Sequence, residues 1–347
     1  MYIPKTYSAI CAKIDQQQGK EDGVSKTAVV IPNYNGIKFL SDCLNSLKKQ
    51  SVQDFDVVVV DDCSSDDSIK EIECNFSWVK CVKRIENGGF AVAVNDGIRY
   101  AKENGAEYIV LLNNDTVAEE YFIEKLVAAI EGDKNCFSVQ AKMLSLKEPE
   151  IIDDAGDFYT VLGWAYARGK GKNASRYNKK GRVFASCGGA AVYRAEIFDK
   201  IGYFDENHFA YLEDIDIGYR AGLFGYYNLY EPEAVVYHAG SATSGSRYNE
   251  FKIRLAARNS VILIYKNQTV LQVILHFVPL TVGFLIKQLF FAIKGYGKIY
   301  HKAVLEGLKL CSTPEMKQKK VGIVKGHFAD ACKIEWNLWV NVLRKIL

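Results

Sequence analysis

The chain has 347 residues, 49% of them hydrophobic and 24% charged, which supplies a large core and excludes a disordered chain, a collagen or a multi-span transporter. A chain of this length suggests about two domains. The net charge of +3 hides an asymmetry, because residues 251–347 hold 16 Lys and Arg against 4 Asp and Glu. This basic C-terminal region predicts an anionic partner, either a membrane surface or a nucleic acid.

The N-terminal residues and the cysteines bear on the compartment. Residues 1–26 contain no sustained apolar run and no small-residue cleavage site, so we expect a leader segment without a signal peptide and a cytoplasmic protein. The nine cysteines are scattered and odd in number, which disfavours a disulfide framework and a zinc ribbon. They favour a reducing compartment.

Strands and helices alternate along the first half of the chain. Apolar periodicity predicts strands at 27–31, 56–60, 78–85, 108–112 and 137–143, and helices at 38–50, 64–74, 90–104 and 118–131. The four consecutive valines at 57–60 are typical of a strand that is buried on both faces. This order predicts an α/β fold with a mainly parallel central sheet flanked by helices.

Polar residues follow the first four predicted strands, and ligands bind at such strand ends in parallel sheets. They are Pro32-Asn33-Tyr34-Asn35-Gly36, Asp61-Asp62, Asn87-Gly88-Gly89 and Asn113-Asn114-Asp115. A nucleotide suits this set, with its base on Tyr34 and Asp62 and a divalent cation on Asp115. Each motif alone also suits a helix cap, a turn or a loop, but their repetition at consecutive strand ends favours a ligand site.

Two strands are predicted in the second half of the chain. One, at 182–193, is interrupted by Cys187-Gly188-Gly189, where the backbone can approach a ligand closely. The other, at 232–238, ends in His238, which is a candidate metal ligand.

An acidic run opens a predicted helix between these strands. Asp214, which follows Glu213, is the candidate general base, because an ionised carboxylate can accept a proton from an acceptor hydroxyl. Acidic residues at a helix start are also favoured by the helix dipole alone, and that reading stays open. Asp216 and Arg220 fit an i,i+4 ion pair, which we assign to structure.

One apolar stretch invites comparison with membrane segments. Residues 267–286 contain no Asp, Glu, Lys or Arg, and Lys287, Lys294, Lys298 and Lys302 follow them. This pattern favours an interfacial helix on an anionic leaflet, with a membrane span or a buried helix as the alternatives.

The ordered motifs resemble those of glycosyltransferase family 2 enzymes with the GT-A fold, in the bacterial rhamnosyltransferase-like branch. The resemblance covers about residues 27–266. It rests on residues 30–36, 60–66, 87–91, 95–97, 112–116, 188–190, 213–216 and 258–259.

The resemblance implies functional roles for particular residues. It implies a donor-nucleotide site at Pro32, Tyr34, Asn35, Asp62, Asn87, Gly89, Asn113 and Asn114. It implies Mg²⁺ or Mn²⁺ at Asp115 and His238, a catalytic base at Asp214, and an acceptor or catalytic loop at Gly188, Gly189 and Glu213. Asn113 stands where the family has the first Asp of its Asp-x-Asp motif, which removes one charge and implies a weaker metal site.

The resemblance also implies an activity. It implies inverting transfer of a sugar from a nucleotide-sugar donor to a hydroxyl of a glycan or lipid-linked glycan, in bacterial cell-surface polysaccharide synthesis. The branch favours L-rhamnose from dTDP-rhamnose, with a UDP-hexose donor as the alternative. A non-catalytic nucleotide-sugar-binding scaffold is the second alternative.

The expected domain division follows from the same motifs and from the charge. A GT-A domain is expected at 27–250, with a nucleotide-binding half at about 27–116 and an acceptor half at about 117–250. Residues 251–347 are expected to form a basic helical region at the anionic inner face of the plasma membrane, although these helices are also able to pair two copies in a homodimer.

Two other classes of protein are disfavoured. A dinucleotide-binding oxidoreductase needs G-x-G-x-x-G after the first strand, and residues 32–36 occupy that place with a different pattern. A nucleic-acid binder is disfavoured because the basic charge lies in a lysine-rich region without a recognisable RNA- or DNA-binding module.

Overall fold

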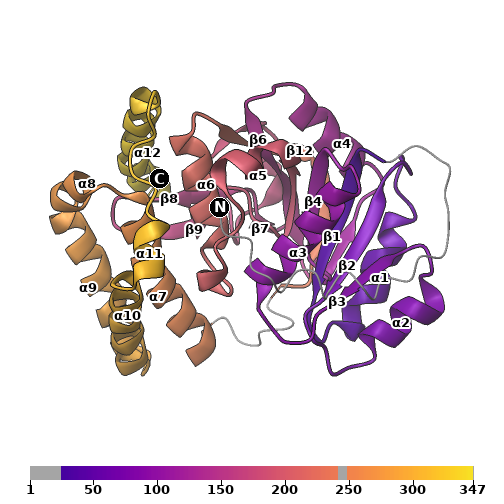
Figure 1. The fold of residues 1–347 in the computed structure, drawn as a ribbon, viewed down its shortest axis with the longest axis horizontal. Helices are drawn as coiled ribbons and strands as arrows, with labels where there is room; N and C mark the ends of the chain where they lie inside the picture. Colours follow the sequence, from indigo (N-terminus) through magenta and orange to yellow (C-terminus); the bar gives the residue numbers. More distant parts are fainter. Residues whose placement is uncertain (1–24, 241–247, 347) are drawn as a thin grey trace.

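The computed structural model describes residues 25–240 and 248–346, so nearly all of the expected leader segment lies outside the described residues. A ten-stranded sheet forms the centre of the molecule, in the order β10-β12-β6-β11-β4-β1-β2-β3, with β5 beside β12 and β7 beside β6 (Figure 1). These strands are β1 Thr27–Asn33, β2 Asp56–Asp61, β3 Lys80–Lys83, β4 Tyr108–Leu112, β5 Thr116–Ala118, β6 Cys136–Ser145, β7 Ile152–Asp154, β10 Gly181–Val183, β11 Ala190–Arg194 and β12 Tyr227–His238. A small second sheet pairs β8 Asp157–Tyr159 with β9 Ala165–Ala167.

The expected parallel arrangement is confirmed for β3, β2, β1 and β4, and again for β6 with β12. β11 runs antiparallel between β4 and β6, so the sheet is largely rather than wholly parallel. The four strands β1 to β4 therefore end at one edge of the sheet, which brings their polar ends together.

Helices cover both faces of the sheet, and each face has its own apolar core. One core packs α1, α2 and α4 against the sheet, and the other packs α3, α5 and α6 against the opposite face. These helices are α1 Ile37–Leu47, α2 Ser68–Asn75, α3 Phe90–Glu103, α4 Phe122–Glu131, α5 Ala195–Ile201 and α6 Glu213–Leu223.

Several sequence-based boundaries need correction, and three of the differences change how the site is built. The helix expected at 118–131 begins at Phe122, because residues 116–118 form β5 and pair with the end of β12. The strand expected at 182–193 is two strands, β10 and β11, with Cys187-Gly188-Gly189 between them. The helix expected at 64–74 begins at Ser68, since preceding backbone N–H groups are held by side chains of the strand-end loops instead.

In the described part of the chain, six helices follow the sheet and form a block at one side of the molecule (Figure 1). They are α7 Glu250–Asn267, α8 Val270–Leu275, α9 Phe277–Ile293, α10 Gly297–Cys311, α11 Pro314–Gln318 and α12 Phe328–Ile346. α7 and α12 share an apolar core with α6 and with Tyr159 beside the sheet. The division at residue 250 stays a prediction, because this core spans it.

The apolar stretch at 267–286 is not one continuous helix. Thr269 and Gln272 form a capping box that begins α8, and His276 separates α8 from α9. Pro279 lies in the first turn of α9, where a missing N–H is tolerated. Among the described residues, no helix combines the length and apolar character that crossing a membrane requires. A buried helix is contradicted, because α8 has no buried residue and α9 buries only Leu280 and Gly283.

Candidate active site

Polar side chains join three strand ends directly. The Asn33 amide at the end of β1 donates to Asp61 Oδ1 of β2 at 2.9 Å and accepts from Asn114 Nδ2 at 2.7 Å. Asp61 also accepts from the Ser64 N–H at 2.9 Å. The strand-end motifs that sequence spacing grouped together therefore do lie together.

The glycine-rich turn after β3 is organised by Asp62, which is 3% exposed. Its carboxylate accepts from the backbone N–H groups of Gly88 and Gly89 at 2.9 and 2.8 Å and from Arg84 Nε at 2.8 Å. Gly89 has φ +80°, and a Cβ there would lie 2.6 Å from the carbonyl oxygen of Phe209. Asp62 therefore shapes the turn, and its expected contact with a base stays a prediction.

The other expected donor-site residues differ in how far they are free to meet a ligand. Tyr34 is 45% exposed, and Asn87 is exposed as well. Asn35 has φ +50°, and its Oδ1 accepts from the Ser65 N–H at 2.8 Å. Pro32 and Asn113 are partly buried. Asn35 thus holds two strand-end loops together, a structural role that sequence reasoning did not assign to it.

The two expected metal ligands are neighbours. β5 and β12 pair with Thr116 opposite His238, and this pairing places His238 Nε2 3.2 Å from Asp115 Oδ1. On its other side, His238 Nδ1 lies 2.7 Å from Asp153 Oδ2, and Asp153 Oδ1 accepts from Lys170 Nζ at 2.7 Å. A chain of charged groups therefore runs from Lys170 to Asp115.

The carboxylates on either side of His238 favour a protonated imidazole when no cation is bound. Burial alone lowers the pKa of His238, but hydrogen bonds and charge from Asp115 and Asp153 outweigh it and raise the pKa to about 9. Burial raises the pKa of Asp153, but His238 and Lys170 lower it to about 2. A divalent cation would take the place of the proton on Nε2.

The donor set fits a divalent cation. A carboxylate oxygen and an imidazole nitrogen that already lie together suit Mn²⁺ or Mg²⁺, and the carboxylate behind the imidazole is the usual second contact of a metal-bound histidine. Asp115 and His238 are only two ligands, so a bound diphosphate would supply others. A different group, Asp154, Asp157 and Cys187, brings three candidate ligand atoms within 4.8 Å of one another.

The candidate base is joined to this end of the sheet through the backbone of the glycine pair. The Gly188 N–H donates to Asp214 Oδ1 at 3.0 Å, and the Gly189 carbonyl accepts from the Asn113 N–H at 2.9 Å. A Cβ at Gly188 would lie 2.9 Å from the ring of Phe90. The backbone between β10 and β11 therefore contacts both the candidate base and the loop after β4, and its expected approach to a ligand stays a prediction.

The two carboxyl groups at the start of α6, Glu213 and Asp214, both have raised pKa values. Burial and the Glu213 charge raise the pKa of Asp214 well above 3.8, against the opposing effect of the Gly188 N–H. Burial raises the pKa of Glu213 to about 7, and its Oε2 has no hydrogen-bond partner among the described residues. The predicted Asp216–Arg220 pair is confirmed at 2.9 Å.

Sequence reasoning missed three residues that shape the site. Arg84 contacts both Asp62 and Asp96, and Asp153 orients His238. Asn259 of α7 holds the loop before α6. The acidic run at 153–157 was a usable signal for Asp153, and residues 258–259 were noted only as part of the resemblance.

The comparison with known families settles the class of protein. Residues 28–202, half of the chain, match the family described as "Glycosyl transferase family 2". The chain belongs to this family. Its fold is the GT-A fold, as the resemblance implied, with a helical C-terminal region. Membership of this family supports the assignment of the protein as a transferase.

The similar proteins include transferases for different sugars. Over 107 residues the chain is 33% identical to "Glycosyltransferase GlyG" of Streptococcus pneumoniae, and this match covers 30% of the chain but only 35% of that protein. Over 239 residues it is 23% identical to the "N-acetylglucosaminyl-diphospho-decaprenol L-rhamnosyltransferase" of Mycobacterium tuberculosis, covering 62% of the chain and 77% of that protein.

A solved structure supports the fold. GalNAc-T7 with UDP, GalNAc and Mn²⁺ aligns with a TM-score of 0.56 at 19% identity, covering 70% of this chain and 48% of that one. At this identity the likeness concerns the fold alone.

Proposed function

We propose that this family 2 member is an inverting glycosyltransferase that acts in bacterial cell-surface polysaccharide synthesis. Its donor is L-rhamnose as dTDP-rhamnose, and its acceptor is a hydroxyl of a glycan or lipid-linked glycan. The observation that carries the proposal is the backbone bridge through Gly188 and Gly189, which ties Asp214 to the strand end that bears Asp115.

The proposed reaction is a single displacement. Asp214 takes the proton from the acceptor hydroxyl as its oxygen attacks the anomeric carbon, and the nucleoside diphosphate leaves from the opposite face, which inverts the centre. Asp115 and His238 would hold a divalent cation, Mg²⁺ or Mn²⁺, whose charge offsets that of the leaving diphosphate. One carboxylate suffices because the leaving group does not need a second acid to protonate it.

Two observations bear on the identity of the donor. The mycobacterial relative is named as an L-rhamnosyltransferase, which supports rhamnose. The GalNAc-T7 structure contains UDP, which keeps a UDP-hexose donor as the alternative.

A thermal-shift panel of dTDP, UDP, GDP and NAD, each with and without Mn²⁺, tests the donor site, because a bound nucleotide raises the melting temperature by mass action. The proposal expects the largest shift with dTDP and a further rise with Mn²⁺. Preference for UDP would redirect the donor to UDP-hexoses. No shift with any nucleoside diphosphate would contradict the proposal.

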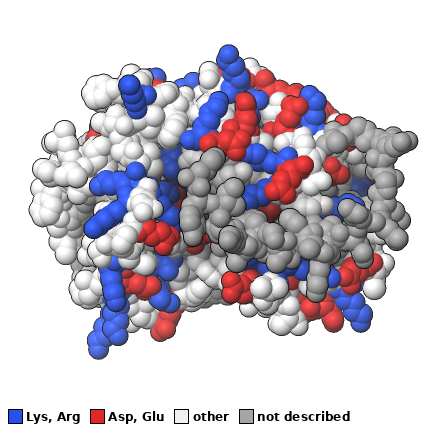
Figure 2. Space-filling model, in the orientation of Figure 1, with Lys and Arg blue, Asp and Glu red and all other residues white. Residues whose placement is uncertain are grey.

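We also propose that the protein is peripheral at the anionic inner face of the plasma membrane. The supporting feature is an apolar face on α8 and α9, whose side chains are 43–77% exposed. Its residues are Val270, Leu271, Ile274, Leu275, Phe277, Val278, Val282, Leu285, Ile286, Leu289 and Ile293. In Figure 2 the end of the molecule that these helices form is mostly white. A contiguous exposed surface of this kind marks a contact site in a folded protein.

Charge around the apolar face favours lipid over a protein partner. Each of the four acidic residues in residues 251–347 is already paired: Glu306 with Arg254, Glu315 with Lys319, Asp330 with Lys333, and Glu335 with His276. Lys294, Lys298 and Lys302, which follow α9, form no ion pair among the described residues and can meet anionic headgroups. Trp336 and Trp339, which are 71% and 48% exposed, suit the level of the lipid headgroups.

Vesicle flotation tests this location. The wild-type protein is expected to float with phosphatidylglycerol vesicles at low salt, and brominated lipids are expected to quench part of its tryptophan fluorescence. The double variant L285S/L289S should stay unbound. Tyr121→Ser, which removes a 50% exposed aromatic side chain from the sheet domain, is the matched control and should float. The proposal would be contradicted if both variants float equally. It would also be contradicted if two copies of the protein cover the apolar face of α8 and α9 by forming a dimer.

A further inference from the structure

The segment that leads into α6 has an unusual backbone. Phe209, Tyr211 and Leu212 have φ values of +62°, +70° and +69°, a region that residues with a Cβ rarely adopt. Three such residues within four positions stand immediately before Glu213 and Asp214. Backbone strain of this kind persists only where the surroundings hold it in place, and it concentrates at functional sites.

One buried amide on α7 holds this segment. Asn259 is 0% exposed, and its Nδ2 lies 2.9, 2.9 and 2.7 Å from the carbonyl oxygens of His208, Ala210 and Tyr211. Its neighbour Arg258 donates through Nη2 to the carbonyls of Asn207 and His208 at 2.8 and 2.9 Å. Two side chains of one helix therefore bind four of the five carbonyls of residues 207–211, all except that of Phe209.

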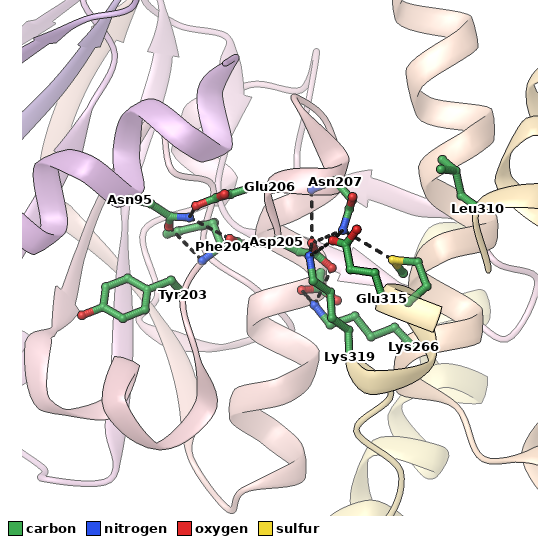
Figure 3. A network of polar contacts seen from close by, with 12 residues as sticks. Asn95, Tyr203, Phe204, Asp205, Glu206, Asn207, Lys266, Leu310, Glu315 and Lys319 are labelled. Atoms are coloured by element: carbon green, nitrogen blue, oxygen red, sulfur yellow. Dashed lines mark hydrogen bonds and ion pairs between the residues drawn. The ribbon is translucent and has the colours of Figure 1, made fainter. Parts of the chain in front are cut away.

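Two turns farther along the same face of α7, a second pair of side chains fixes both ends of the segment. Lys266 Nζ lies 2.9 Å from Asp205 Oδ2 and 2.8 Å from Asp216 Oδ2, and Asn267 Nδ2 donates to Asp216 Oδ1 at 2.7 Å. Lys319 reaches the other oxygen of Asp205 at 3.1 Å (Figure 3). Asp205 and Asp216 bracket the acidic pair, so α7 holds this segment at its start, its middle and its end.

The opposite side of the segment touches the glycine-rich turn and α3. The Phe209 carbonyl, which Asn259 does not bind, accepts from the Ala91 N–H at 3.2 Å. Asn95 binds both the N–H and the carbonyl of Phe204, at 3.0 and 2.8 Å (Figure 3). Residues 204–212 therefore lie between the turn expected to bind the donor and α7.

We infer that Asn259, assisted by Arg258, is a positioning residue for the proposed catalytic base. It acts through the backbone of residues 207–212, which it holds in the conformation that sets where α6 begins and where Asp214 points. This inference rests on the proposed glycosyl transfer. The C-terminal helices are then part of the catalytic apparatus, besides any role at a membrane.

Asn259→Asp is the main test, because it keeps the shape of the side chain and replaces the donating amide with a carboxylate that repels three carbonyls. Misplacing a reacting group by about 1 Å costs about 100-fold in rate, so we expect kcat to fall about 10- to 100-fold. KM for the donor and the nucleotide-induced thermal shift should stay within about twofold of wild type. Ser260→Ala is the matched control, since Ser260 is buried on the same helix and, among the described residues, its hydroxyl bonds within that helix, to the Ala256 carbonyl.

A double-mutant cycle separates positioning from general damage. If Asn259 acts through Asp214, adding N259D to D214N should change kcat by less than about twofold, because the interaction is already lost. Arg258→Lys, which keeps the charge and shortens the reach, is the milder variant for the case in which N259D does not fold. Full additivity of N259D and D214N, or equal effects of N259D and S260A, would overturn the inference.

Amide hydrogen exchange provides a readout that does not depend on the donor sugar. N259D should speed exchange in residues 207–216 and leave β1, β2 and β4 protected, whereas S260A should leave both unchanged. If N259D alters exchange but the wild-type protein transfers no sugar, the proposed function fails and the positioning role fails with it. If transfer is present and exchange in 207–216 does not change, only the positioning role fails.

Discussion

At the scale of single residues, the proposed base Asp214 depends on the charge of its neighbour. Burial and Glu213 raise its pKa well above 3.8, so Asp214 stays protonated, and inactive as a base, to a higher pH than an exposed aspartate. The rate of transfer should therefore fall as the pH drops through this raised pKa. Glu213→Gln removes one negative charge, lowers the pKa of Asp214 and should move the acidic limb of the kcat/KM profile to lower pH. An unmoved limb, or one that moves to higher pH, would show that Glu213 does not set this pKa.

Asp153 is the second residue with a consequence that can be measured. Its bond to His238 Nδ1 fixes the direction of Nε2 toward Asp115, and loss of such a partner weakens metal binding about 10- to 100-fold. We expect Asp153→Asn to shift the Mn²⁺ dependence of the nucleotide-induced thermal shift by that factor. Asp199→Asn, which removes an exposed ion pair with Lys102, should leave the Mn²⁺ titration unchanged. Equal titrations for both variants would count against the expected metal site.

The residue scale also shows the limit of sequence reasoning. Polar residues at strand ends are recognisable because strand pattern and residue type coincide there, so the grouping of Asn33, Asp61 and Asn114 was predictable. The three carbonyls that Asn259 binds lie 48–51 positions earlier in the chain, and a side chain that reaches backbone leaves no pattern of residue types. The same holds for Asp62, whose contacts with backbone N–H groups shape a turn 26 residues away.

At the scale of elements, the glycine-rich turn and the strained segment constrain each other. Gly89→Ala would place a Cβ 2.6 Å from the Phe209 carbonyl at a φ of +80°, whereas Gly171→Ala has a φ of +77° and meets nothing within 4 Å. The control therefore carries the backbone strain without the clash. We expect G89A to be less stable than G171A by about 1–3 kcal/mol in urea unfolding and to lose nucleotide binding. Equal free energies of unfolding for the two variants would show that the glycine-rich turn and residues 207–212 do not constrain each other.

Elements also differ in how well the sequence predicted them. The predicted bounds of β1, β2, β4 and α3 agree closely with the structure, because a sustained pattern of apolar residues indicates each of these elements. β5 has only three residues and forms by pairing with β12, about 120 positions later, so no local sequence pattern predicts it. The break between α8 and α9 did have local signals, the Thr269–Gln272 capping box and Pro279, but the sequence interpretation did not use them to place a helix boundary.

At the scale of the whole molecule, the charge asymmetry along the chain corresponds to two structurally different parts. The acidic first part forms the sheet with the candidate site, and the basic C-terminal part forms the helical block that carries the apolar face. α7 connects the two, because it holds the segment before Asp214 and continues into α8. The sequence predicted the two parts from composition, but it did not predict that they share a core.

We propose that the protein transfers a sugar from a nucleotide donor with Asp214 as the base. The most direct measurement is release of nucleoside diphosphate from dTDP-rhamnose and from UDP-hexoses, with Mn²⁺ and a bacterial lipid-linked glycan extract, by the wild type and by Asp214→Asn. We predict acceptor-dependent release by the wild type and a loss of about 100- to 10,000-fold in D214N, with its nucleotide-induced thermal shift retained. Equal release by the two proteins, or no release from any donor, would contradict the proposed function.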